Sequence, residues 1–249
     1  MIRRLILASL LTVTLEGYGQ TSVSGGTSFS GGVTVAGARF THVQGNSSIT
    51  AGSQTTISVV LTPAPVTGHV VCVALLLSGG TPITGLTIKD ANNNSYTVTP
   101  NSPSSGGPAP FPVFLAYLLS APSNASATIT AAWASPAQGA ELFADEFAVL
   151  GAAATFDVDI AGNGLTGTAI NSPTITPAHS KELLYAAAGG TGTMTAPTAN
   201  ATIGVWTGAG GGIQDAAAMA EYILNGSTAT AVNFTQTSGD WDALAMAIQ

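Results

Sequence analysis

Charged side chains are scarce in this sequence. Only 7% of its residues are Asp, Glu, Lys or Arg, against about 25% in ordinary globular domains. Because surface helices carry charged and polar side chains on their solvent face, a mainly helical fold is not expected. The chain has 5 basic and 12 acidic residues, so it lacks the clustered Lys and Arg that bind phosphate backbones. We therefore expect no nucleic-acid partner.

Cysteine and catalytic motifs are also missing. Cys72 is the single cysteine, which excludes an intramolecular disulfide, and its apolar neighbours predict a buried side chain. His42, His69 and His179 are far apart in the sequence and match no zinc-binding spacing. No Gly-x-Ser-x-Gly segment occurs, so the simplest hydrolase hypothesis is excluded. We predict a protein that is not an enzyme.

No run of 18 consecutive apolar residues is present, so no membrane-spanning helix is expected. The chain begins with Arg3 and Arg4, continues through an apolar stretch over residues 5–15, and reaches Gly17 and Gly19. This pattern is typical of a secretory signal peptide. The alternative is a buried element of the folded domain. We favour the first interpretation. It predicts a leader over residues 1–19 and a mature chain that is secreted, extracellular or at the cell surface, and not inserted in the membrane.

What the sequence does contain is Thr, Ser, Ala, Val, Asn and 30 glycines, which are residues of strands and tight turns. Short apolar or alternating runs recur between turn signals without intervening helical periods. This spacing predicts a single all-β domain over residues 45–249, an antiparallel β-sandwich of jelly-roll type. Strands are expected at residues 53–61, 70–77, 84–89, 95–99, 113–119, 127–133, 142–150, 155–160, 183–188, 202–207, 231–237 and 241–248.

Three segments need separate comment. Residues 215–224 have good helix propensity but can equally form a strand before the Asn225-Gly226 turn, and the strand is favoured. Both faces of residues 241–248 are apolar, which predicts a strand in the middle of a sheet. Residues 101–112 form the longest irregular stretch, which we expect to be a surface loop.

The N-terminal segment alternates with period two over residues 22–35, with Val23, Phe29, Val33 and Val35 on one face. We assign residues 20–44 to an extension that joins the domain through residues 45–48. Such a strand can complete the sheet of a neighbouring copy, since strand addition needs only backbone pairing and alternate side-chain pockets. A donor contact of this kind is heterologous and generates a filament. The alternative is that the strand pairs within its own sandwich.

The densest charge in the chain is an acidic group of five residues. Its members can be solvated strand ends, oxygen ligands for Ca²⁺ or the two carboxylates of a glycosidase, and solvation is favoured. Asp157 and Asp159 are the Ca²⁺ candidates, because residues two apart share a strand face. The string Gly162–Gly167 matches the dinucleotide pattern, but no helix pattern follows it, so a glycine-rich turn is expected. The group comprises Glu141, Asp145, Glu146, Asp157 and Asp159.

Residues 88–97 carry a motif that resembles a recurring pattern of secreted bacterial β-sandwich domains. A strand ends in Asp90, a short turn follows, and the next strand opens with Tyr96-Thr97. The turn has three asparagines where the pattern usually has a glycine. Later matching segments are Phe114–Tyr117, Ala127–Trp133, Glu146-Phe147, Phe156-Asp157, Glu221-Tyr222 and Trp241. The resemblance covers residues 53–249 and implies a jelly-roll or concanavalin-like sandwich, used in extracellular and often non-catalytic proteins.

These observations favour a secreted structural protein that polymerises with copies of itself by strand exchange. The alternative is an extracellular adhesive module that binds polysaccharide, with or without Ca²⁺. A glycosidase built on the acidic group is the third hypothesis. No other cofactor is indicated.

Overall fold

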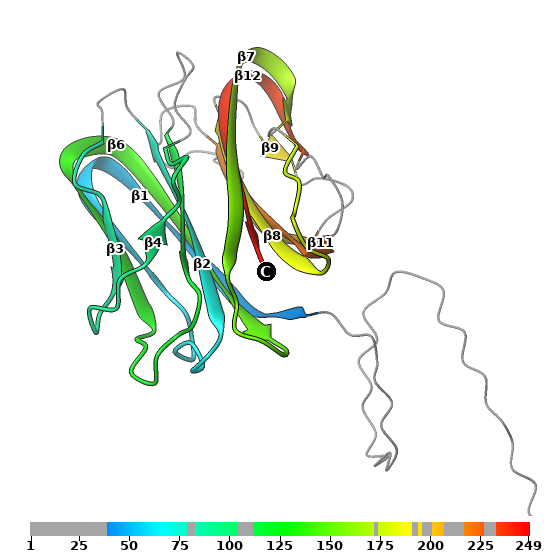
Figure 1. Ribbon diagram of the computed structural model, residues 1–249. Coiled ribbons are helices and arrows are strands. Elements are labelled where there is room, and N and C mark those ends of the chain that lie inside the picture. Colours follow the sequence, from blue (N-terminus) through cyan, green and yellow to red (C-terminus); the bar gives the residue numbers. More distant parts are fainter. Residues whose placement is uncertain are drawn as a thin grey trace, which may run out of the picture. The chain divides into compact units, whose positions relative to one another are not determined.

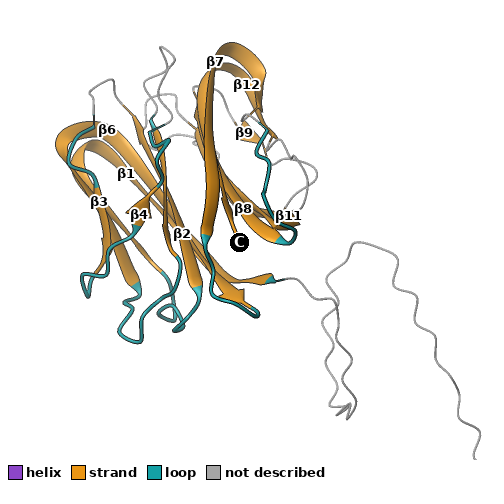
Figure 2. Cartoon of the chain, in the orientation of Figure 1, coloured by secondary structure: helices purple, strands orange, loops and turns teal. Residues whose placement is uncertain are grey.

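The computed structural model describes residues 39–78, 83–103, 112–171, 174–190, 194–195, 201–206, 217–226 and 233–249. Every regular element in these ranges is a strand (Figure 2). No helix among them is long and apolar enough to cross a membrane. The strands form two antiparallel sheets, so the predicted all-β sandwich is confirmed.

The first sheet contains six strands from the first half of the domain (Figure 1). Their order is β1-β6-β2-β5-β4, and β3 pairs with β6 beside this path. Their bounds are β1 Phe40–Val60, β2 Val70–Ser78, β3 Thr87–Asp90, β4 Thr97–Val98, β5 Val113–Leu118 and β6 Thr128–Val149.

The second sheet repeats this topology. Its order is β10-β11-β8-β12-β7, with β9 paired to β12, so each strand takes the place of the strand six positions earlier in the chain. The sequence shows no obvious repeat, and this duplication was not predicted. The bounds are β7 Phe156–Asn171, β8 Glu182–Gly190, β9 Met194–Thr195, β10 Ala201–Trp206, β11 Ala217–Gly226 and β12 Asn233–Ile248.

Two long strand pairs, β1 with β6 and β7 with β12, replace several shorter strands that the sequence suggested. The sequence suggested a linker at residues 45–48, turns at residues 135–136 and 162–167, and a break near residue 239, but all four segments lie inside strands. Residues 45–48 pair regularly with β6, whereas the other three lie at register shifts, for example opposite Gln54 and Thr56 of β1. Extra residues at such bulges bend a strand without ending it. Turn-type residues therefore mark bends here rather than strand ends.

The long pairs curl over their own sheets, as Figure 1 shows. The far ends of β1 and β6 pack with β3 over one face of the first sheet and enclose a cluster that includes Ile57, Leu142 and Trp133. Phe234 and Trp241 of β12 lie in the corresponding cluster of the second sheet. A third cluster joins the two sheets and includes Phe143 and Leu244.

Several expectations about single segments are confirmed. β11 makes residues 217–226 a strand, and β12 lies between β7 and β8. Cys72, Trp133 and Trp241 are buried, whereas the side chain of Trp206 lies outside the described residues. In the turn after β3, Asn93 has a φ of 67°, a left-handed conformation that Asn tolerates better than most residues. This explains how asparagine stands where the resembling domains have glycine.

The predicted leader and the predicted donor strand, with Val23, Phe29, Val33 and Val35, lie outside the described residues. The compact unit begins at Ala38 and β1 at Phe40. Phe40 pairs with Val149 and Gln44 with Glu146. Residues 40–44, which the sequence placed in the extension, are therefore part of the first sheet.

Candidate functional site

The five acidic residues of the dense group are mostly buried, so the interpretation as a solvated face is wrong. Glu141, Asp145, Glu146 and Asp159 are each 7% exposed or less. Alternation along β6 turns neighbouring carboxylates to opposite faces of a sheet that is covered on both sides. Burying a carboxylate is costly unless hydrogen bonds compensate, so the partners of each group decide what it can do.

Asp145 joins the two sheets through a hydrogen-bonded group. Tyr185 of β8 donates to its Oδ2 at 3.0 Å, and His42 Nε2 lies 3.1 Å from its Oδ1. Burial raises the pKa of Asp145 to about 6, and the bonds from His42 and Tyr185 oppose the rise. Burial and the charge of Asp145 raise the pKa of the Cys72 thiol well above its usual value. A thiol that stays protonated is a poor nucleophile, so Cys72 is not expected to react. The bond between Asp145 and Tyr185 has a structural role, because it links the two sheets.

Glu146 fixes the connection between β1 and β2. Its Oε1 accepts hydrogen bonds from Val66 N at 2.7 Å and from His69 Nδ1 at 2.6 Å. Gln44 of β1 donates to Oε2. Both oxygens of Glu146 therefore accept hydrogen bonds from the β1–β2 region, which gives this carboxylate a structural role.

Glu141 and Asp242 are buried with less compensation. Oε1 of Glu141 and both oxygens of Asp242 have no hydrogen-bond partner among the described residues. Burial raises the pKa of Glu141 to about 8, and burial with the charge of Asp240 raises the pKa of Asp242 to about 7. Perturbed carboxyls often mark functional sites, but within the described ranges neither residue belongs to a cluster of metal-ligand side chains. Their main effect is on stability.

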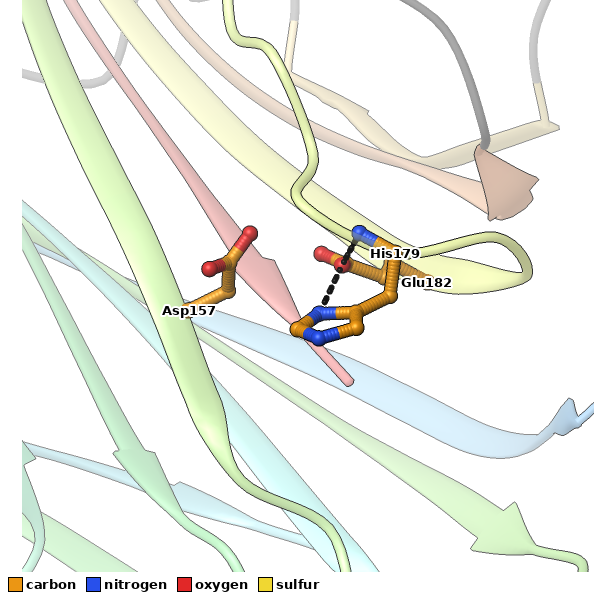
Figure 3. Close-up of side chains that lie close together, drawn as sticks. All are labelled: Asp157, His179 and Glu182. Carbon is orange, nitrogen blue, oxygen red and sulfur yellow. Dashed lines mark hydrogen bonds and ion pairs between the residues drawn. The ribbon is translucent and has the colours of Figure 1, made fainter.

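A cluster of a different kind lies where β7 and β8 begin. Asp157, His179 and Glu182 each offer a ligand atom, and these atoms all lie within 4.8 Å of one another (Figure 3). Oε1 of Glu182 accepts the backbone N–H of His179 at 2.7 Å and lies 3.2 Å from its Nδ1. Oδ2 of Asp157 accepts the N–H of Ala178 at 2.8 Å. Burial raises the pKa of Glu182, as do the charge of Asp157 and a side-chain hydrogen bond between the two carboxyl groups, while the bonds from His179 oppose the rise.

The structure does not bring Asp157 and Asp159 together as the sequence suggested. Val158 pairs with Ala247 but Phe156 with Ile248, so Asp157 is the extra residue of a β-bulge. The bulge reverses the alternation: Phe156 packs into the cluster between the sheets, and Val158 packs on the outer face. Asp157 therefore joins His179 and Glu182.

Asp159 has different partners. It accepts hydrogen bonds from the backbone N–H of Asn101 at 2.7 Å and from its Nδ2 at 3.1 Å. These bonds hold the start of the predicted long loop against β7. The predicted Ca²⁺ pair is thus divided between two environments, and only Asp157 lies in a cluster of ligand groups.

A second candidate surface is the outer edge of β1. This 21-residue strand pairs with β6 on one side, and no strand among the described residues pairs with its other side. The strand contains no Asp, Glu, Lys, Arg or Pro. Native edge strands are usually protected by such residues. Two side-chain bonds join the first part of this curved strand to its end: Asn46 donates to Val60 O, and Gln44 donates to Pro63 O just after the strand.

Sequence reasoning missed the His179 cluster for a clear reason. His179 and Glu182 are three residues apart, but Asp157 is on another strand and only the bulge turns it toward them. The available signal was the pair His179 and Glu182 after Pro177, at the start of an apolar strand. Comparisons of the chain with protein-family models, with curated proteins and with solved structures found no match.

Proposed function

We propose that this is a secreted, non-catalytic structural protein that polymerises by β-strand addition. The alternating segment of residues 22–35 from one copy would pair with the outer edge of β1 in the next copy. The observation that carries the proposal is the uncharged, proline-free edge of β1. Because an unpaired edge presents a row of backbone donors and acceptors, it favours pairing with an added strand.

The proposed donor segment and the acceptor edge of β1 have similar lengths. Residues 47–58 of β1 are close in number to the alternating segment over residues 22–35. Within this stretch the N–H of Ser47 bonds to Asn46 and the carbonyl of Ala51 to Gln54, so an added strand would have to displace these side chains or pair with the other backbone groups. The bulges of β1 near Gln54 bend this edge, so an added strand has to follow the same curve. The donor's glycines suit that bend, since glycine adopts backbone conformations that other residues avoid. A donor at one end and an acceptor edge elsewhere make the contact heterologous, and repetition gives a filament.

Deleting residues 20–37 from the mature protein is expected to leave a folded monomer that forms no filaments. The deletion must end before Ala38, because residues 40–44 pair with β6 and their loss would damage the first sheet. Negative-stain electron microscopy measures assembly, and circular dichroism measures folding. Filaments formed by the deleted chain, or loss of its fold, would contradict donation by this segment.

The acceptor edge is tested separately by Thr55→Lys. Thr55 is exposed on β1, and a lysine on an edge strand opposes pairing with another strand. We expect at least a tenfold rise in the concentration needed for assembly, with unchanged thermal stability. Ala91→Lys places the same charge on the exposed turn after β3 and should assemble like the wild type. Equal assembly of all three proteins would exclude the β1 edge as acceptor.

A further inference from the structure

We propose that Asp157, His179 and Glu182 form a binding site for a divalent cation of the zinc class. An acidic cluster alone would not support this inference. The independent observation is the carboxylate of Glu182, which is buried and whose Oε2 receives no hydrogen bond from an N–H or hydroxyl donor among the described residues. In Figure 3 one oxygen of this carboxylate meets the N–H and the imidazole of His179, and the other is directed toward Asp157.

The donor set favours zinc over calcium. One imidazole nitrogen and two carboxylate oxygens are ordinary zinc ligands, whereas Ca²⁺ takes six to eight oxygens. Ligand atoms around tetrahedral zinc lie about 3.4 Å apart, given bonds of about 2.1 Å. The three ligand atoms already lie within 4.8 Å of one another. The side chain of His179 is 51% exposed, so a small rotation of the ring can close the remaining gap.

The surroundings already orient the ligands. The N–H of Ala178 holds Oδ2 of Asp157, and the N–H of His179 holds Oε1 of Glu182. Such second contacts fix the direction of metal-binding groups. Zinc would also compensate the buried charge of Glu182 and the repulsion between the two carboxylates. The site is therefore arranged for a cation and gains from one.

The position of the cluster indicates what the ion does. Asp157 is on β7 and Glu182 on β8, and the end of β12 lies between these strands. Both carboxylates lie at the register where β12 ends, since Ile248 pairs with Phe156 of β7 and with Leu183 of β8. A bound ion would join β7 to β8 and hold the end of β12 in the sheet. This inference does not depend on the proposed polymerisation.

The test is a thermal-unfolding and calorimetric titration of the full chain with ZnCl₂, CaCl₂ and MgCl₂ after treatment with a chelator. At 100 times its Kd, zinc should raise the Tm by about 5–10 °C for a domain of this size. Ca²⁺ and Mg²⁺ at the same concentration should have no effect. No response to zinc, or an equal response to Ca²⁺, would overturn the proposal.

Matched variants locate the ion. Asp157→Asn and His179→Ala should each weaken zinc binding by at least tenfold. Because the side chain of His179 is exposed, its truncation should leave the fold intact. Asp159→Asn alters the neighbouring carboxylate, which Asn101 holds, and should keep the wild-type response. His69→Asn removes a histidine outside the cluster and should keep it too. Zinc binding that survives both cluster substitutions, or that is lost in either control, would place the ion elsewhere and contradict the assignment.

Discussion

Removing the last seven residues, Ala243–Gln249, is expected to abolish the cooperative fold of the domain. These residues form most of the β12 segment that pairs with both β7 and β8, so their loss separates the centre of the second sheet. Their side chains also fill two clusters. Leu244, Met246 and Ile248 lie between the sheets, and the alternate alanines lie on the outer face. Each large side chain lost from a core costs about 2–5 kcal/mol, against a total stability of about 5–15 kcal/mol.

Near-UV circular dichroism and limited proteolysis of the truncated chain measure this effect. Removing only Gln249 is the control. This residue exchanges two backbone hydrogen bonds with Thr155, so its loss should lower the Tm by a few degrees and leave unfolding cooperative. A truncated chain with native near-UV signals and wild-type resistance to protease would show that the central strand is dispensable.

Glu141→Gln is expected to stabilise the protein above neutral pH. Glu141 pairs with Leu76 of β2 and alternates with Phe143, which packs between the sheets, so its side chain faces that core. Burial raises its pKa to about 8 from a usual value of 4.5. Keeping the carboxyl protonated at pH 7 while the unfolded chain is ionised costs about 3 kcal/mol, at about 1.4 kcal/mol for each pKa unit.

The sign follows from proton linkage. Because the folded chain binds this proton more tightly, the contribution of Glu141 to stability is most favourable below its unfolded pKa of 4.5. This contribution to the free energy of unfolding then falls as the pH rises toward about 8. Asp242, whose pKa is raised to about 7, adds to this fall. Glu141→Gln should remove part of the slope and gain about 1–3 kcal/mol at pH 8, less than the full cost because the amide also needs partners.

Urea unfolding at several pH values between 4 and 9 measures the slope. Glu146→Gln is the matched control on the same strand, because its carboxylate accepts bonds from Val66, His69 and Gln44. That substitution should lower the free energy of unfolding. The amide keeps one acceptor oxygen, but its NH₂ group cannot accept the hydrogen bonds that the second carboxylate oxygen accepts. If both substitutions change the free energy of unfolding in the same direction, the missing hydrogen-bond partner of Glu141 does not explain its effect on stability.

The sequence predicted the positions of several strands but not their full length or their order in the sheets. Apolar alternation predicted that residues 70–77 and 241–248 are strands, and β2 and β12 confirm it. The same reasoning separated residues 127–133 from 142–150, because Ser135-Pro136 is a turn signal. In the structure these residues belong to the irregular stretch of β6 opposite Gln54 and Thr56, where proline displaces no regular ladder bond.

The sequence alone determined the fold class. Low charge, many β-branched and small residues, and a period of two favour sheets, because the chain has few of the charged side chains that usually solvate the outer faces of helices. It also indicated the burial of Cys72 and the strand nature of residues 217–224. These properties are local, since they depend on which side chains stand two residues apart.

The tertiary structure alone decided how the carboxylates are used. Glu141, Asp145 and Glu146 are close in sequence and look alike, yet one lacks a partner for an oxygen, one joins the two sheets and one fixes a loop. Asp157 and Asp159 were expected on one face, and a single extra residue in β7 separates them. The duplicated sheet topology was equally hidden. Hydrogen-bond partners and strand neighbours come from distant parts of the chain, and the energy of a buried charge depends on them rather than on its position in the sequence.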